Sequence, residues 1–257
     1  MLKTRYYLLF GLLCYLLFML ATAPAASLRL LLGDNDRVNV EGLRGSLWQG
    51  HADRVIIDDA YPIDDLNWRL HPGALLLLKL SASLQGQFDA RPFAAELSVS
   101  ATGNVQAKSV RAEIAAATLA ELAAIPLAQL DGDIDIELAS LVWQRGGIPR
   151  ANGQIHWRQA RITVAESVEL GDVDIRLEAQ DDGVLAKINN REGDLKTSGS
   201  ARLGDDRQYQ LNLILKPLAG APANLQNSLA MFARRQRNGQ FVVQSSGALP
   251  DDLLPDF

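Results

Sequence analysis

The chain has 257 residues, of which 48% are hydrophobic and 21% charged, so it is long enough to bury a core and too apolar for wholesale disorder. Its formal net charge of −5 argues against a nucleic-acid partner, because binding nucleic acid needs a basic face. One cysteine and three histidines exclude an intrachain disulfide and a four-cysteine zinc site, and leave little room for a histidine-rich metal site.

The N-terminal segment predicts a transmembrane anchor over residues 6–28. No charged residue occurs between Arg5 and Arg29, and 16 of the 18 residues in 6–23 are apolar. A helix of roughly 20 apolar residues crosses the hydrocarbon core of a bilayer. The segment is therefore long enough to span a membrane once.

The charges beside this segment predict its orientation. Lys3 and Arg5 precede it and no acid offsets them, so the positive-inside rule makes residues 1–5 a cytoplasmic stub and exports residues 29–257. Removing these two cations from 25 basic residues leaves 23 against 30 acidic ones, a net of −7 for the exported part. Cys14 lies inside the anchor, so the exported part has no cysteine, which suits an oxidising compartment.

A cleaved signal peptide is the competing interpretation of the same segment. Ala21, Thr22 and Ala23 match the small-x-small cleavage pattern. The apolar run is longer than a usual signal core, however, and Pro24 would follow the cut, where proline is poorly accepted. An uncleaved anchor is favoured, and both interpretations export the rest of the chain.

The exported part has the alternating pattern of β-strands. Apolar residues recur at every second position in 131–138, 154–158, 172–179 and 209–216. Short polar turns are predicted between such runs, among them residues 152–153 and 181–183. Such strands bury one face and leave the other wet, as antiparallel sheets do. We predict a mainly β fold, a curved antiparallel sheet in the form of a rolled sheet or an open sandwich.

Three further segments break this pattern. Residues 109–124 are alanine-rich, and residues 222–235 begin with proline and end in arginines, so each predicts a short helix. The leucine run 75–78, extended by Leu80, is too short to span a bilayer. It predicts a buried strand, or else a surface that meets a membrane or a partner.

Candidate chemistry is weak throughout the chain. His51 and Asp53 match no usual zinc spacing and are interpreted as part of a solvated loop. The acidic row from Asp131 to Glu137 would spread along about 20 Å of strand and favours a wet strand face. No serine–histidine–acid trio or nucleotide-binding loop can be nominated. We therefore predict no enzyme activity, no catalytic residue, no cofactor and no metal site.

The tryptophans are the best candidates for contacts. Trp48 lies in the segment Gly-Ser-Leu-Trp-Gln-Gly (45–50), and Trp68 lies in Trp-Arg-Leu-His-Pro (68–72). Packing in the core is the ordinary role of such residues, and an interface is the functional alternative. Trp48 and Trp68 are retained as candidate interaction residues.

The order of these features resembles a known family. A charged stub and an apolar span lead to the two tryptophan segments 45–50 and 68–72, then to Leu130-Asp131-Gly132, Trp143 and Trp157. This order is similar to that of type II secretion system protein N, also called general secretion pathway protein N. The family also looks like a short relative of AsmA-like proteins, whose curved sheets form an apolar groove.

The resemblance implies a single-pass protein of the bacterial inner membrane with a periplasmic domain over residues 29–257. It implies an accessory role in moving folded proteins from the periplasm across the outer membrane. Other secretion subunits and the inner membrane would be its partners. The alternative is a lipid-binding or lipid-transfer protein of the AsmA-like type, with lipid in an apolar groove.

Overall fold

The computed structural model of the protein describes residues 38–57, 61–122, 129–144, 146–163, 167–219, 221, 224–230 and 233–248, together with residues scattered over 7–27. The chain divides into two compact units, residues 1–92 (unit 1) and 93–257 (unit 2). Much of the predicted anchor, including Lys3 and Arg5, lies outside the described residues. Among the helices that are described, none is both long enough and apolar enough to cross a bilayer.

Unit 1 is an antiparallel sheet. Its strands are ordered β1-β3-β4-β5, with β2 paired to β3 at the start of that strand. Its elements are β1 (Val38–Glu41), β2 (Arg44–Gly45), β3 (Gln49–Ile57), β4 (Tyr61–Leu70), the 3-10 helix η1 (Pro72–Leu77) and β5 (Lys79–Phe88).

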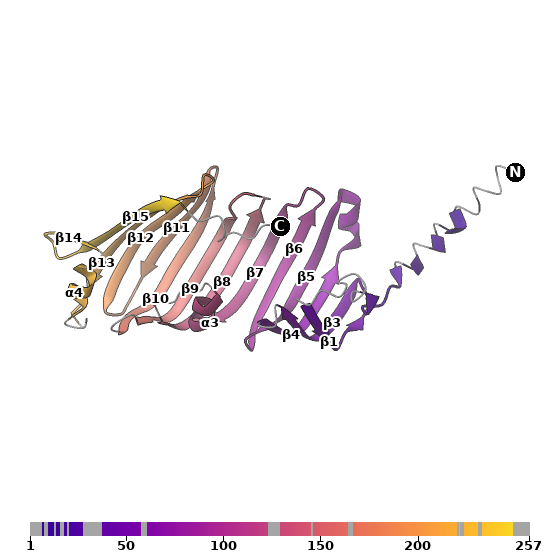
Figure 1. The fold of residues 1–257 in the computed structure, drawn as a ribbon, viewed down its shortest axis with the longest axis horizontal. Coiled ribbons are helices and arrows are strands. Elements are labelled where there is room, and N and C mark those ends of the chain that lie inside the picture. Colours follow the sequence, from indigo (N-terminus) through magenta and orange to yellow (C-terminus); the bar gives the residue numbers. More distant parts are fainter. Residues whose placement is uncertain are drawn as a thin grey trace. The chain divides into compact units, whose positions relative to one another are not determined.

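Unit 2 is an antiparallel meander followed by one reordered pair at its end (Figure 1). Sequential strands pair from β6 to β13, and then β15 lies between β13 and β14. Its strands are β6 (Arg91–Ser100), β7 (Val105–Ala115), β8 (Gln129–Trp143), β9 (Arg150–Thr163), β10 (Ser167–Gln180), β11 (Gly183–Asn190), β12 (Leu195–Gly204), β13 (Gln208–Pro217), β14 (Arg234–Arg235) and β15 (Phe241–Ala248). Its helices are α3 (Ala116–Leu122) and α4 (Leu225–Ala230).

The alternating sequence pattern produces two chemically different faces in unit 2. Because side chains of paired residues point to the same side, the register sorts them into rows across the strands. One row forms the centre of the polar face and consists of Arg111, Glu137, Gln154, Arg176, Lys187, Ser200, Asn212 and Gln244. The neighbouring row forms the centre of the apolar face and consists of Ala112, Ile136, Ile155, Ile175, Ile188, Gly199, Leu213 and Val243. The prediction of a mainly β, antiparallel fold is confirmed.

The main core lies at the C-terminal end of the apolar face, beneath α4. Leu225 and Leu229 of this helix pack with Val173, Leu215 and Phe241 of the sheet. Phe241 is the largest fully buried side chain among the described residues, with 1% of its surface exposed. The short helix thus covers one end of a sheet face that would otherwise be open to water.

Both predicted helices are present, but they are shorter than predicted. Residues 109–115 belong to β7, because Val110, Ala112 and Ile114 alternate with polar residues and pair with β8. Only residues 116–122 form a helix there. At the second site α4 covers 225–230, and Arg234 and Arg235 pair with β15 instead of ending the helix.

The leucine run 75–78 is not a buried strand, so that prediction was wrong. Residues 72–77 form the 3-10 helix η1, and Leu76, Leu77 and Leu78 are 89%, 73% and 74% exposed. Pro72 begins this helix, and Leu78 has a left-handed backbone conformation with φ of 55° that ends it. The proline and the tight turn prevent the run from joining the sheet.

Candidate functional site

The structure brings the two tryptophan segments of the sequence together in unit 1. The indole nitrogen of Trp68 donates a hydrogen bond of 3.0 Å to the carbonyl oxygen of Leu47. Its ring lies against Gly50, where an added Cβ would come within 2.2 Å of it. The carbonyl oxygen of Trp48 accepts a 2.7 Å bond from the backbone of Leu70. Trp68 therefore holds the tight turn over residues 45–50 against the end of β4.

The same turn binds the chain that leaves the predicted anchor. The backbone N–H of Leu47 donates to the carbonyl oxygen of Ala23 at 2.8 Å, and that of Ala25 donates to Gly45 at 3.0 Å. Pro24 and Ser46 form an antiparallel bridge between these bonds. Ala25 is 1% exposed. No local pattern predicts this contact, because it joins residues 20 or more positions apart.

Both half-buried tryptophans, Trp48 and Trp68, thus lie at the junction between the N-terminal segment and the sheet. Trp143 and Trp157 likewise donate their indole N–H to backbone carbonyls, those of Gly147 and Asp131. The indole groups of Trp68, Trp143 and Trp157 therefore stabilise neighbouring backbone segments. A role for Trp48 or Trp68 in binding a partner stays a prediction.

Replacing Trp68 by phenylalanine should lower the free energy of unfolding by about 1–2 kcal/mol, since the ring stays over Gly50 but the Leu47 carbonyl loses its donor. Urea unfolding of the purified full chain measures this, with Tyr61→Phe as a control at an exposed site. Unchanged stability together with lost binding to a partner protein would instead identify Trp68 as an interface residue.

His51 and Asp53 lie on strand β3, so their interpretation as a solvated loop was wrong. The ring of His51 bonds Asp53 through Nε2 at 3.0 Å and Asn67 through Nδ1 at 3.1 Å. Arg44 reaches both carboxylate oxygens of Asp53. With a guanidinium bound to it, this carboxylate is an ion-pair member rather than a free general base.

Ion pairs cross-link the polar face of unit 2. The ring of His156 donates from Nδ1 to Asp174 at 2.6 Å, and Arg191 reaches the other carboxylate oxygen at 3.1 Å. The hydrogen bond from His156 is the main cause that lowers the pKa of Asp174, and Arg191 adds to it against the opposing effect of burial. Arg158 pairs with Asp135 at 2.8 Å on the neighbouring strands. The predicted wet face of the acidic row is thus a salt-linked surface.

This pair predicts an acid-dependent loss of stability. The pKa of Asp174 is lowered in the folded state, so its ionised carboxylate adds to the free energy of unfolding. This contribution is fully present above the ordinary carboxyl pKa of about 4, and it is lost as the pH falls through the lowered pKa. Asp174→Asn should therefore destabilise the protein at pH 7 and much less at about pH 3. Urea midpoints at both pH values test this, with Asp181→Asn in an exposed turn as the control. An equal effect of Asp174→Asn at both pH values would contradict it.

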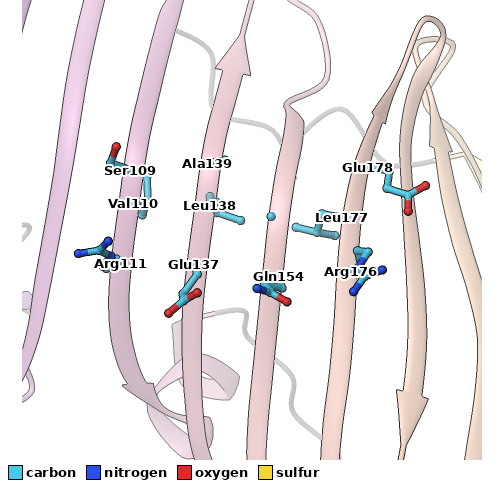
Figure 2. A pocket seen from close by; sticks show the side chains of 11 residues that line it. Ser109, Val110, Arg111, Glu137, Leu138, Ala139, Gln154, Arg176, Leu177 and Glu178 are labelled. Carbon is cyan, nitrogen blue, oxygen red and sulfur yellow. The ribbon is translucent and has the colours of Figure 1, made fainter.

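A shallow depression of about 530 Å³ opens over strands β7 to β10 (Figure 2). Arg111, Glu137, Gln154 and Arg176 project in a row along its lining, beside Leu138 and Leu177. No histidine or cysteine belongs to its described lining, and of its charged side chains Arg111, Glu137 and Arg176 are exposed while Glu178 is half-buried. The arrangement suits a polar contact better than the activation of a nucleophile.

Over the described ranges, no three histidine, cysteine or acidic side chains gather in a group that could hold a metal ion.

The apolar face of unit 2 offers a different kind of surface. Each residue of its central row is only half-buried, from Ala112 on β7 to Val243 on β15. An apolar row that stays partly accessible across eight strands is a surface for another apolar group.

Comparisons with known proteins find relatives that cover most of the chain. A family profile described as "Type II secretion system (T2SS), protein N" matches residues 36–244. The protein called "Type II secretion system protein N" in Vibrio cholerae serotype O1 is 24% identical over 217 residues, which cover 82% of this chain and 85% of the relative. The protein of the same name in Aeromonas hydrophila is 23% identical over 243 residues, covering 93% and 96%. No solved structure matches. Because the profile extends over most of the sequence, the chain belongs to the family of type II secretion system protein N.

Proposed function

We propose that this protein is an accessory inner-membrane subunit of the type II secretion system, which supports the export of folded proteins from the periplasm across the outer membrane. The observation that carries the proposal is the family match over residues 36–244. The protein acts by holding its sheets beside the membrane as a platform for other subunits, without chemistry of its own.

Its membrane attachment is the segment 6–28, with residues 1–5 in the cytoplasm and 29–257 in the periplasm. The orientation follows from Lys3 and Arg5 by the positive-inside rule, and two observations support an uncleaved membrane segment. Tyr7, Phe10 and Phe18 expose 76%, 66% and 67% of their surfaces, as side chains do that meet lipid rather than protein. The bonds of Ala23 and Ala25 to the 45–47 turn also favour an uncleaved chain, since a cut after Ala23 would separate its carbonyl from Leu47.

Its binding surfaces for other subunits are the polar face of unit 2 and the sheet edges. An edge strand offers unpaired backbone groups that a strand from another protein can extend. The polar face offers exposed charges of both signs in one row, with Glu137 on β8, Arg176 on β10 and Lys187 on β11. These features suit recognition between subunits that assemble and separate.

The test is recovery of partners from the membrane. Full-length tagged protein is purified from solubilised inner membranes, and co-purified proteins are identified by mass spectrometry. The proposal expects other secretion subunits, together with reduced secretion of exoproteins when the protein is deleted. Protease added to spheroplasts should cut the exported part and spare a cytoplasmic marker. Intact secretion without any co-purified subunit would refute the proposed role.

The half-buried apolar row of unit 2 favours a second candidate, an AsmA-like protein that binds or transfers lipid along this face. Acyl chains would lie across Ile155, Ile175 and Ile188, which follow one another on three strands. Mass spectrometry of gently purified protein would then detect bound phospholipid, and Ile175→Lys would remove it while the exposed-face control Arg176→Gln would not. Absence of lipid from the unaltered protein would refute this candidate.

A further inference from the structure

The connection between β4 and β5 presents a cluster of exposed leucines on an ordered loop. Leu75, Leu76, Leu77 and Leu78 are 43%, 89%, 73% and 74% exposed, and Leu80 is 50% exposed. We call these five residues the leucine tip. The loop is held by bonds from Ala74 to His71 and from His71 to Ser81, of 3.0 and 2.8 Å. A folded loop that keeps four consecutive leucines in water needs an apolar environment to cover them.

The charge around the leucine tip indicates what kind of surface covers it. No acidic residue occurs in 66–88, although the whole chain has a net charge of −5. Arg69, His71 and Lys79 flank the tip and are exposed. Leucines bordered by cations are typical of segments that lie in a bilayer interface, where the leucines enter the acyl region and the cations meet lipid phosphates.

The leucine tip also lies close to the end of the apolar N-terminal segment, which suits contact with a bilayer interface. The N–H of Leu47 binds the carbonyl of Ala23 at the end of the apolar N-terminal segment, and Trp48 in turn binds the N–H of Leu70 at the end of β4. The 3-10 helix of the tip begins two residues later, at Pro72. Hydrogen-bonded neighbouring chains lie about 4.8 Å apart. The exit of the N-terminal segment and the base of the tip therefore lie at one end of the same sheet, within about 10–15 Å.

We propose that the leucine tip inserts into the interface of the same bilayer that holds residues 6–28, and so forms a second membrane contact. This inference rests on the proposed membrane attachment. One helix leaves a domain free to rotate and tilt, whereas two contacts on one sheet end fix the direction in which β3, β4 and β5 leave the membrane. Trp68 and the turn 45–50 join the two contacts.

The test places a fluorescent probe on the tip of the membrane-bound protein. The native cysteine is replaced by Cys14→Ser, and Leu77→Cys is labelled with an environment-sensitive dye in the full chain. The protein is reconstituted in vesicles of phosphatidylethanolamine and phosphatidylglycerol. The matched control is Tyr61→Cys, which is 40% exposed but lies at the other end of β4, about 30 Å from Leu70.

The expected result is a blue-shifted emission at position 77 that lipid-borne quenchers reduce roughly three-fold more than the emission at position 61. Equal quenching of both sites by a water-soluble quencher, in protein that floats with the vesicles, would overturn the proposal and leave a protein partner to cover the tip. Protein that does not float with vesicles at all would refute the membrane attachment, and with it this inference.

Discussion

Replacing Phe241 by alanine is expected to lower the free energy of unfolding by about 3–5 kcal/mol. Phe241 is 1% exposed and lies where β15 meets Leu215 of β13 and the two buried leucines of α4. Alanine would leave a cavity that this short helix cannot fill by itself. Urea unfolding of the detergent-purified full chain measures the loss.

The matched control is Ile214→Ala on the adjacent position of β13. Ile214 is 42% exposed and its side chain points to the opposite face from Leu215, so its removal should cost less than about 1 kcal/mol. Equal losses for the two variants would mean that α4 does not bury this end of the apolar face.

The second large effect is expected for Asn190→Ala, which should cost about 2–4 kcal/mol. Asn190 is 6% exposed, and its side-chain amide donates to the carbonyls of Leu170 and Leu195 at 2.7 and 2.6 Å. Its oxygen accepts the N–H of Thr197 at 2.6 Å. Alanine leaves these groups unpaired in the core, where water replaces them poorly.

The control for this variant is Asn189→Ala, one residue earlier on β11. Its side chain is exposed on the other face, so the change should stay within about 0.5 kcal/mol. Thermal unfolding of both variants measures the two losses of stability. An Asn190→Ala protein as stable as the unaltered one would show that solvent reaches the β11–β12 connection.

The sequence predicted the strands of unit 2 well because one face is buried and the other is wet. Residues 131–138, 172–179 and 209–216 alternate as predicted and lie in β8, β10 and β13. Such alternation is a local consequence of the sheet geometry, so it can be read without knowing which strands pair. The predicted turn at 181–183 also joins two strands, β10 and β11.

Predictions failed where contacts distant in sequence decide the structure. Asn152 and Gly153 resemble a hairpin turn, but they lie inside β9. The amide of Asn152 donates to Ser140 on β8, and its oxygen accepts the N–H of Ala179 on β10. An added Cβ on Gly153 would lie 2.3 Å from the carbonyl of Glu137. Because Gly153 has no side chain, the neighbouring strand β8 can approach the backbone of β9 closely. The local sequence around Gly153 does not reveal this contact.

The candidate site was predicted only in part for the same reason. Trp48 and Trp68 were selected because of their unusual segments, and the structure places both at the turn 45–50. The turn is joined to Ala23 by the N–H of Leu47, to Trp68 by the carbonyl of Leu47 and to Leu70 by the carbonyl of Trp48. Each of these bonds links residues more than 20 positions apart, so no local pattern predicts them. The leucine run 75–78 predicts a buried strand or else a surface for a membrane or a partner, and only its exposure in the folded chain excludes the strand.

The proposed role of this protein as an inner-membrane subunit of the type II secretion system requires that it bind other subunits in the membrane. Mass spectrometry of the full-length tagged chain, purified from solubilised inner membranes of its own host, tests this, with a tagged unrelated single-pass protein as the control. We expect other subunits of the secretion system to co-purify with this chain and not with the control. The same small background of proteins in both samples, with exoprotein secretion intact after deletion, would contradict it.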